Sequence, residues 1–134
     1  MSFLRATRKV TERIHIDCPL ANALEFIQNP EAMIDINPLV IHRHQDPNDP
    51  NLWIIKDSLK VMGVMKYEIE YTARFARVVN GTDVEVHAPA GTTLLSHWRV
   101  TEVEGRVQIE EEVNISASVR KPSADNYPFA RLAG

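Results

Sequence analysis

The chain has 134 residues, of which 15 are basic and 18 acidic, so its formal net charge is −3. This length predicts one domain over residues 1–134, and 44% apolar residues exclude a disordered chain. The first and last strands predicted below place its core at 8–119. The negative charge argues against nucleic-acid binding, and no apolar run approaches the roughly 18 residues needed to span a bilayer.

The first predicted elements are a strand and a helix. Residues 8–17 alternate in hydropathy, which is typical of a strand with one buried face, and the apolar residues of that face are Val10, Ile14 and Ile16. Pro19 then begins a helix, since a proline in the first turn needs no backbone N–H. The apolar stripe of that helix consists of Leu20, Ala23, Leu24 and Ile27.

A second helix and a further strand complete the first half of the chain. Asn29 is expected to cap this helix, with Pro30 in its first position, and the helix runs to about Ile36. Residues 39–45 then form a strand, which the turn-rich segment 46–51 ends.

Glycines divide the second half of the chain into five strands. The Asn80-Gly81 pair predicts a type I′ hairpin turn, because both central positions of that turn need a positive φ. The five strands cover 52–60, 65–79, 82–88, 92–103 and 106–119. The complete element order predicts an α+β fold, in which a curved antiparallel sheet wraps around whatever covers its concave face.

Several short motifs lie at the ends of these elements. Those of the first half are Asn29-Pro30-Glu31 and Asn37-Pro38-Leu39-Val40, and those of the second half are Met62-Gly63, Ala88-Pro89-Ala90-Gly91 and Ser96-His97-Trp98-Arg99-Val100. With the element order, they resemble the START-like superfamily, also called Bet v 1-like, SRPBCC or polyketide cyclase-type. The second group is more specifically similar to an uncharacterised START-like family of filamentous fungi. The resemblance covers about residues 3–119.

The resemblance implies a helix-grip fold, in which a seven-stranded antiparallel sheet surrounds a long C-terminal helix and an apolar cavity lies between them. Members bind lipids, sterols, polyketides or plant metabolites, and some cyclise or dehydrate polyketides. This chain departs from the pattern after residue 119, because only 15 residues follow. A helix of ordinary length needs more chain at ~1.5 Å per residue. Either the chain is cut short, or a partner subunit closes the cavity, for which a homodimer is expected.

Glu111 is the first candidate for chemistry. It lies in mid-strand, in phase with the apolar residues of one face, which are Val107, Ile109, Val113, Ile115, Ala117 and Val119. Glu12 shows the same phase more weakly in the first strand. A desolvated carboxyl has a raised pKa that suits a general acid or base, so Glu111 is predicted to be catalytic. The alternative is a twist or bulge that brings this carboxyl to water or to an ion pair.

Two tyrosines are predicted to point into the same cavity. Tyr67 and Tyr71 alternate with Ile69, Ala73 and Phe75, while the intervening residues are mostly charged. Tyr71 is the second predicted catalytic residue, since a buried phenol can orient or polarise a ligand carbonyl. Tyr67 is predicted to bind the ligand. The alternative for both rings is simple packing.

The remaining predicted ligand-binding residues share the apolar faces of the strands. They are Trp53, Asp57, Phe75, Ser96, Trp98, Ile109 and Val113. Asp57 and Ser96 supply the polar points of this wall, although Asp57 is close to a strand end and could equally be solvated.

No cofactor or metal is predicted. His42 and His44 share one strand face, but a metal site needs further ligands on facing elements, and the sequence has no glycine-rich phosphate loop. The single cysteine, Cys18, excludes an internal disulfide and favours a cytoplasmic protein.

These features predict a protein that binds a hydrophobic small molecule in an apolar cavity. The favoured activity is that of a cofactor-independent cyclase, dehydratase or isomerase acting on a polyketide-like or other secondary metabolite. A non-catalytic carrier of a lipid, sterol or metabolite would use the same cavity, and the sequence barely separates the two. A third alternative is an interaction module whose missing helix comes from a partner.

Overall fold

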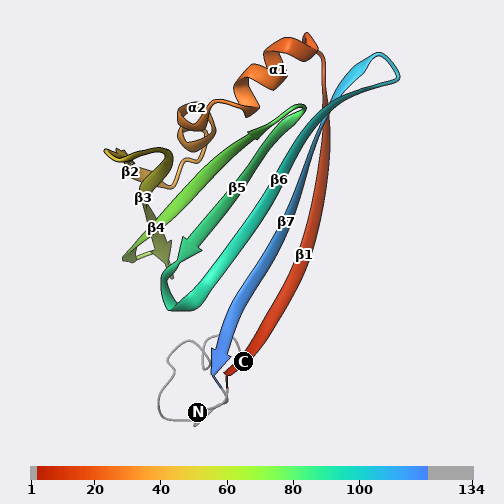
Figure 1. Cartoon of the computed structure of the whole chain (residues 1–134). Coiled ribbons are helices and arrows are strands. Elements are labelled where there is room, and N and C mark those ends of the chain that lie inside the picture. The colour runs from red at the N-terminus through yellow and green to blue at the C-terminus, as the bar shows by residue number, and fades with distance from the viewer. Residues whose placement is uncertain (1–2, 121–134) are drawn as a thin grey trace.

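The computed structural model describes residues 3–120, which form seven strands, two α-helices and one short 3-10 helix (Figure 1). The strands are β1 (Phe3–Ile16), β2 (Val40–Asp46), β3 (Asp49–Val61), β4 (Met65–Val78), β5 (Gly81–Ala88), β6 (Thr92–Val103) and β7 (Arg106–Arg120). The helices are α1 (Leu20–Ile27), α2 (Pro30–Asp35) and the 3-10 helix η1 (Pro89–Gly91). The predictions made for the tail beyond residue 120 lie outside the described residues.

All seven strands belong to one antiparallel sheet with the order β1-β7-β6-β5-β4-β3-β2. β1 pairs with β7 from Phe3↔Arg120 to Ile16↔Val107, so the first and last strands lie side by side. The sheet is curved, and α1 and α2 lie across one end of it (Figure 1). The predicted helix-grip class, with two short helices after the first strand, is confirmed.

Local sequence explains both helices. The side-chain oxygen of Asn29 accepts a hydrogen bond from the Ala32 N–H at 3.3 Å, so Asn29 caps α2 as predicted, with Pro30 in the first position. α1 begins one residue later than predicted, because Pro19 is its N-cap and has an extended backbone. Within residues 3–120, no helix has both the length and the apolar content that crossing a bilayer requires.

The β4–β5 turn differs from its prediction. Val79 and Asn80 form a two-residue loop, and neither Asn80 nor Gly81 has a positive φ, so the predicted type I′ turn is wrong. Gly81 is needed for another reason, because a Cβ there would lie 1.7 Å from the Trp98 carbonyl oxygen. The φ values that a type I′ turn requires occur instead at the β6–β7 turn, where Glu104 has 54° and Gly105 has 78°.

The turn predicted at 46–51 is shorter than expected. Only Pro47 and Asn48 lie between the strands, and β3 begins at Asp49. The carboxylate of Asp46 accepts a hydrogen bond from the Asn48 N–H at 2.8 Å, and this local bond allows a tight turn. Both strands are therefore longer at this end than the turn-forming composition indicated.

The buried apolar side chains form two clusters between the helices and the sheet. The α2 cluster consists of Ile34, Trp53, Ile55, Ala73, Phe75 and Val84. The α1 cluster consists of Ala23, Ile27, Val100, Val107 and Ile109. Met33 and Trp98 are partly buried and pack against both clusters, so they connect the two parts of the core.

Candidate ligand-binding site

A pocket of about 220 Å³ lies between α2 and the sheet. The residues that line it from α2 and the segment after it are Met33, Ile34, Asn37 and Val40. Those that line it from strands β3 to β6 are Ile55, Tyr71, Ala73, Phe75, Val84, Val86, Ser96 and Trp98. The wall is therefore mostly apolar, with polar side chains only at Asn37, Tyr71 and Ser96.

Arg43 of β2 fixes α2 over the sheet. Its guanidinium donates hydrogen bonds to both carboxylate oxygens of Asp35, at 2.6 and 3.0 Å, and to Glu31 at 3.3 Å. The guanidinium carbon also lies 5.4 Å from the centroid of the Trp53 ring. The hydrogen bond from Arg43 holds the pKa of Asp35 below its ordinary value. One side chain thus joins the helix, the edge strand and the α2 cluster.

Tyr71 and Asp57 form a polar pair at the pocket wall. The Tyr71 hydroxyl donates a hydrogen bond to Asp57 Oδ1 at 3.0 Å, and both side chains are half-buried. Burial of the phenol, together with the charge and hydrogen bond of the Asp57 carboxylate, raises the pKa of Tyr71 above its ordinary value. Tyr71 therefore stays protonated and can donate a hydrogen bond to Asp57 or to a polar ligand atom.

The pocket brings together several of the residues singled out from the sequence. Those that line it are Tyr71, Phe75, Ser96 and Trp98. Asp57 contacts the wall through Tyr71. Trp53 is buried in the α2 cluster and lies opposite Ala73 in the β3–β4 register, so it supports the wall without lining the pocket.

Glu111 lies outside the pocket lining, beside one of its walls. In the sheet register it is opposite Trp98 of β6 on one side and Glu12 of β1 on the other. β7 has no register shift at this position, so the side chain keeps the apolar phase that the sequence predicted. The carboxyl is half-buried, and this burial, with the nearby charge of Glu12, raises its pKa.

The other predicted residues lie at different places on the sheet. Ile109 is buried in the α1 cluster, away from the pocket lining. Val113 is half-buried and lies opposite Ser96 in the β6–β7 register. Tyr67 is 47% exposed on the β3–β4 hairpin, where it lies opposite Leu59.

Sequence reasoning missed the helical side of the pocket. Met33, Ile34 and Asn37 line it from α2 and its C-terminal end. With only six residues, α2 is too short to show a full apolar period. The available signal was the adjacent apolar pair Met33-Ile34 between a capping Asn29 and the helix-ending Pro38.

The two histidines of β2 form no metal centre with their neighbours. His42 and His44 are exposed, and their ring centroids are 5.8 Å apart. In the described part of the chain, no group of three or more His, Cys, Asp or Glu side chains is placed to hold a metal ion.

The family model for a domain of unknown function, DUF7053, matches residues 6–127. The chain belongs to the DUF7053 family. No curated protein matches this DUF7053 chain in sequence.

Solved structures resemble the DUF7053 chain in fold. The Zhui aromatase/cyclase from Streptomyces sp. R1128 aligns with a TM-score of 0.66 and 14% identity, over 87% of this chain and 72% of its own. An uncharacterized protein from Rhizobium leguminosarum aligns with a TM-score of 0.61 and 13% identity, over 99% and 90%. Ara h 8.0201 aligns with a TM-score of 0.57 and 9% identity, over 96% and 87%. At these identities the likeness shows the fold alone, which is START/Bet v 1-like.

Proposed function

We propose that the chain binds a hydrophobic small molecule in the pocket between α2 and the sheet. The observation that carries this proposal is the lining, which is apolar apart from Asn37, Tyr71 and Ser96. An apolar wall with a few polar groups that orient the ligand is the usual composition of a small-molecule site. The volume of about 220 Å³ is below the ~300–1,000 Å³ of drug-sized sites, so a compact ligand of one or two rings fits better than a long lipid.

The activity we favour is a cofactor-independent cyclisation, dehydration or isomerisation of a polyketide-like or other secondary metabolite. Tyr71 is kept protonated and lies in the pocket wall, so it can donate a hydrogen bond to a ligand carbonyl. Glu111 lies next to Trp98, and its raised pKa suits proton transfer to a part of the ligand that extends past the indole. The aromatase/cyclase of similar fold supports this class of reaction.

A non-catalytic carrier is the second candidate. One observation favours it: Glu111, the group with the clearest acid-base character, does not line the pocket. A carrier needs only the apolar walls and the hydrogen bond that Tyr71 can donate. The fungal origin, supported by the motifs, and the cytoplasmic location, supported by the single cysteine, are part of the same proposal. The homodimer stays a prediction.

A pocket-filling variant tests ligand binding. The purified protein is extracted with organic solvent, and mass spectrometry identifies the molecule that co-purifies. Val86→Trp places an indole in the hollow and is expected to lower the bound amount roughly tenfold, because the same space cannot hold both. Val79→Trp is the matched control, since Val79 is 95% exposed at the β4–β5 turn. Equal occupancy in both variants would refute the proposed pocket.

Two conservative variants separate the enzyme from the carrier. For an enzyme, Glu111→Gln and Tyr71→Phe are expected to lower turnover of a candidate polyketide about 10²–10⁴-fold, the usual contribution of one positioned proton donor or acceptor. Ligand affinity is expected to change far less, since both substitutions preserve side-chain size. Turnover that survives in both variants would exclude these residues as the catalytic groups.

A further inference from the structure

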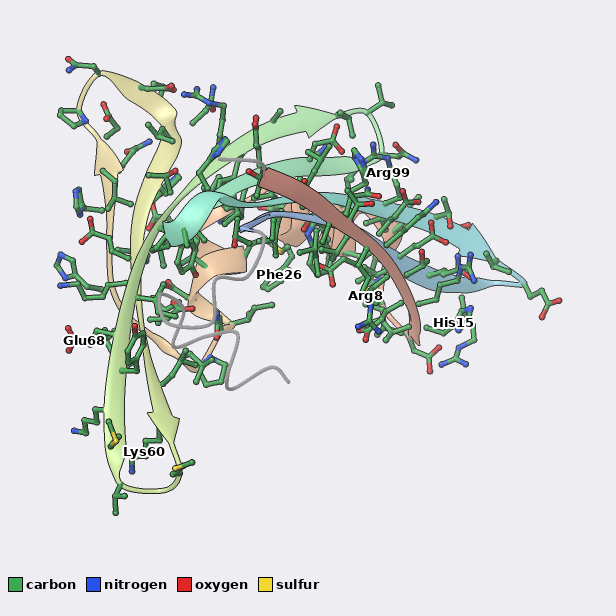
Figure 2. The ribbon with its side chains drawn as sticks, turned by 90° about the horizontal axis from the view of Figure 1, so that it is seen from below. Arg8, His15, Phe26, Lys60, Glu68 and Arg99 are labelled. Atoms are coloured by element: carbon green, nitrogen blue, oxygen red, sulfur yellow. The ribbon has the colours of Figure 1, made fainter. Side chains whose placement is uncertain are left out.

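The β3–β4 hairpin extends beyond the rest of the sheet and ends in exposed apolar side chains. Figure 2 shows its two strands running away from the body of the molecule, with Lys60 close to the tip. Met62 is 82% exposed, Val64 86% and Met65 62%. Apolar side chains gathered on a surface usually mark a site of interaction with a protein, a ligand or a membrane.

The turn at the tip presents Met62 to solvent. Met62 has a positive φ of 56°, a conformation that favours glycine, asparagine or aspartate. A methionine at this position is strained and also leaves its side chain exposed.

Two lysines lie directly behind the apolar tip. Lys60 and Lys66 are opposite each other in the β3–β4 register, so their side chains leave the same face of the hairpin. Like charges in directly opposite positions destabilise a sheet, and an anion bound by both would remove that repulsion. The next acidic side chain of β4, Glu68, lies further from the tip (Figure 2). Its Oε2 lies 4.0 Å from Nζ of Lys56, so it pairs with that lysine.

The other face of the hairpin connects the tip with the pocket. Met65, Tyr67, Ile69 and Tyr71 alternate along β4 on that face, and Tyr71 lines the pocket. Tyr67 comes immediately after Lys66, and tyrosine is enriched at the level of lipid headgroups. From the tip inwards, the order is therefore apolar side chains, a lysine pair and a tyrosine.

We propose that the tip of the β3–β4 hairpin, residues 60–67, docks on an anionic lipid bilayer. Met62, Val64 and Met65 enter the boundary between headgroups and acyl chains. Lys60 and Lys66 reach the phosphates while their aliphatic stems lie along the apolar layer. A ligand that partitions into the bilayer then reaches the pocket along the Tyr67 face, a step that rests on the proposed function.

Vesicle co-sedimentation of the full chain tests the docking. We expect the wild type to bind vesicles of phosphatidylcholine with phosphatidylserine more tightly than vesicles of phosphatidylcholine alone. Lys60→Gln with Lys66→Gln is expected to weaken binding to the anionic vesicles about 25-fold, at about fivefold per lysine. Added salt weakens wild-type binding in the same direction. Arg77→Gln, which removes an exposed charge elsewhere on β4, is the control and leaves binding unchanged.

The apolar part of the tip is tested separately. Val64→Ser with Met65→Ser is expected to weaken binding at least tenfold on both kinds of vesicle, whereas Val79→Ser, at the exposed β4–β5 turn, has no effect. In a second readout, Val64→Trp adds an indole whose emission is expected to move to shorter wavelength on anionic vesicles. Circular dichroism confirms that each variant is folded.

Three outcomes overturn the docking proposal: no wild-type binding to anionic vesicles, equal binding of wild type and tip variants, or unchanged Val64→Trp emission. If the tip instead holds two copies of the chain together, the wild type sediments as a dimer and does not bind vesicles, and the Val64→Ser/Met65→Ser variant sediments as a monomer. Uptake of prodan, a fluorescent probe with two fused rings and one carbonyl group, from preloaded vesicles tests the ligand step. Tip variants slow this uptake but keep their affinity for the probe in buffer. Vesicle binding with no probe uptake at all supports the docking and contradicts the proposed pocket function.

Discussion

Any side chain at position 81 would clash with the backbone of Trp98. A Cβ at this position lies 1.7 Å from the Trp98 carbonyl oxygen and 2.8 Å from its carbonyl carbon. Gly81→Ala is therefore expected to displace β6 from β5 and to lower the free energy of unfolding by about 3 kcal/mol, measured by urea denaturation. Gly63→Ala is the control, because its Cβ meets nothing within 4 Å and only its φ of 76° adds strain, about 1–2 kcal/mol. Equal losses in the two variants would contradict the steric argument.

Glu111 gives the stability of the protein a defined pH dependence. Because its pKa is raised in the folded state, the folded chain binds the proton more tightly than the unfolded chain. The resulting contribution to stability is present below the unfolded pKa and is lost as the pH rises through the folded pKa. Glu111→Gln also removes the like-charge pair with Glu12. Glu111→Gln is therefore expected to raise the free energy of unfolding by about 0.2–1 kcal/mol near neutral pH and to leave it unchanged in acid.

Urea denaturation at neutral and acidic pH measures this effect. Glu102→Gln is the matched control, since it removes the same charge from an exposed strand position. A loss of stability in Glu111→Gln near neutral pH would show that the carboxylate has a favourable partner in the folded chain.

The phase of Glu111 on its strand could be predicted because side chains alternate strictly along a strand, and β7 carries no register shift there. The distance of Glu111 from the pocket could not be predicted from the sequence. That distance depends on where α2 crosses the sheet and on the Trp98 ring, which are tertiary features. The sequence singled out Gly81 as a turn residue. In the structure a glycine is needed there because the Trp98 backbone of another strand lies too close for a Cβ, and the local sequence does not show that contact.

At the scale of elements, Arg43 decides how firmly α2 covers the pocket. Arg43→Gln removes the hydrogen bonds to Asp35 and Glu31 and the contact with the Trp53 ring, of which the ring contact alone contributes about 0.5–1 kcal/mol. Amide hydrogen exchange in α2 is expected to become faster, and the affinity for the pocket ligand is expected to fall. The pKa of Asp35 is lowered by Arg43, so the ion pair is lost in acid, as the pH falls through the folded pKa.

Arg13→Gln is the control for this prediction. It removes an ion pair between β1 and Glu110 of β7, with Nε to Oε2 at 2.5 Å, in the part of the sheet that does not line the pocket. Exchange in α2 is expected to stay at the wild-type rate. Equal acceleration in both variants would mean that α2 responds to general loss of stability instead of to its own anchor.

The elements differ in how far their sequence determines them. The existence of the long strands was predictable because hydropathy alternates over many residues, but β1 begins at Phe3 and not at residue 8 as predicted. α2 was predictable because Asn29 and Pro30 form a local cap that needs no tertiary contact. The 46–51 segment is rich in turn-forming residues throughout, and which two of them form the turn depends on the pairing of β2 with β3. The pairing of β1 with β7 joins strands that lie far apart in the sequence, so local patterns could not predict it.

At the scale of the whole molecule, Trp98 connects the pocket to the half of the core under α1. It lines the pocket, and it packs against both the α2 cluster and the α1 cluster. A ligand that restrains this indole is therefore expected to slow amide hydrogen exchange in α1 and in the Val107–Ile109 segment of β7, beyond the pocket lining. Trp98→Leu removes the shared contact, and it is expected to lower the free energy of unfolding by about 3 kcal/mol and to abolish the ligand-dependent protection under α1.

Ile27→Val separates this coupling from a general loss of stability. Ile27 is buried in the α1 cluster, so removing one methyl group costs about 0.5–1.5 kcal/mol, but Trp98 keeps its place between the clusters. The ligand is therefore expected to protect α1 in Ile27→Val as it does in the wild type. Protection confined to the pocket-lining strands of the wild type would show that the two clusters respond independently, and the contact of Trp98 with both would then be packing alone.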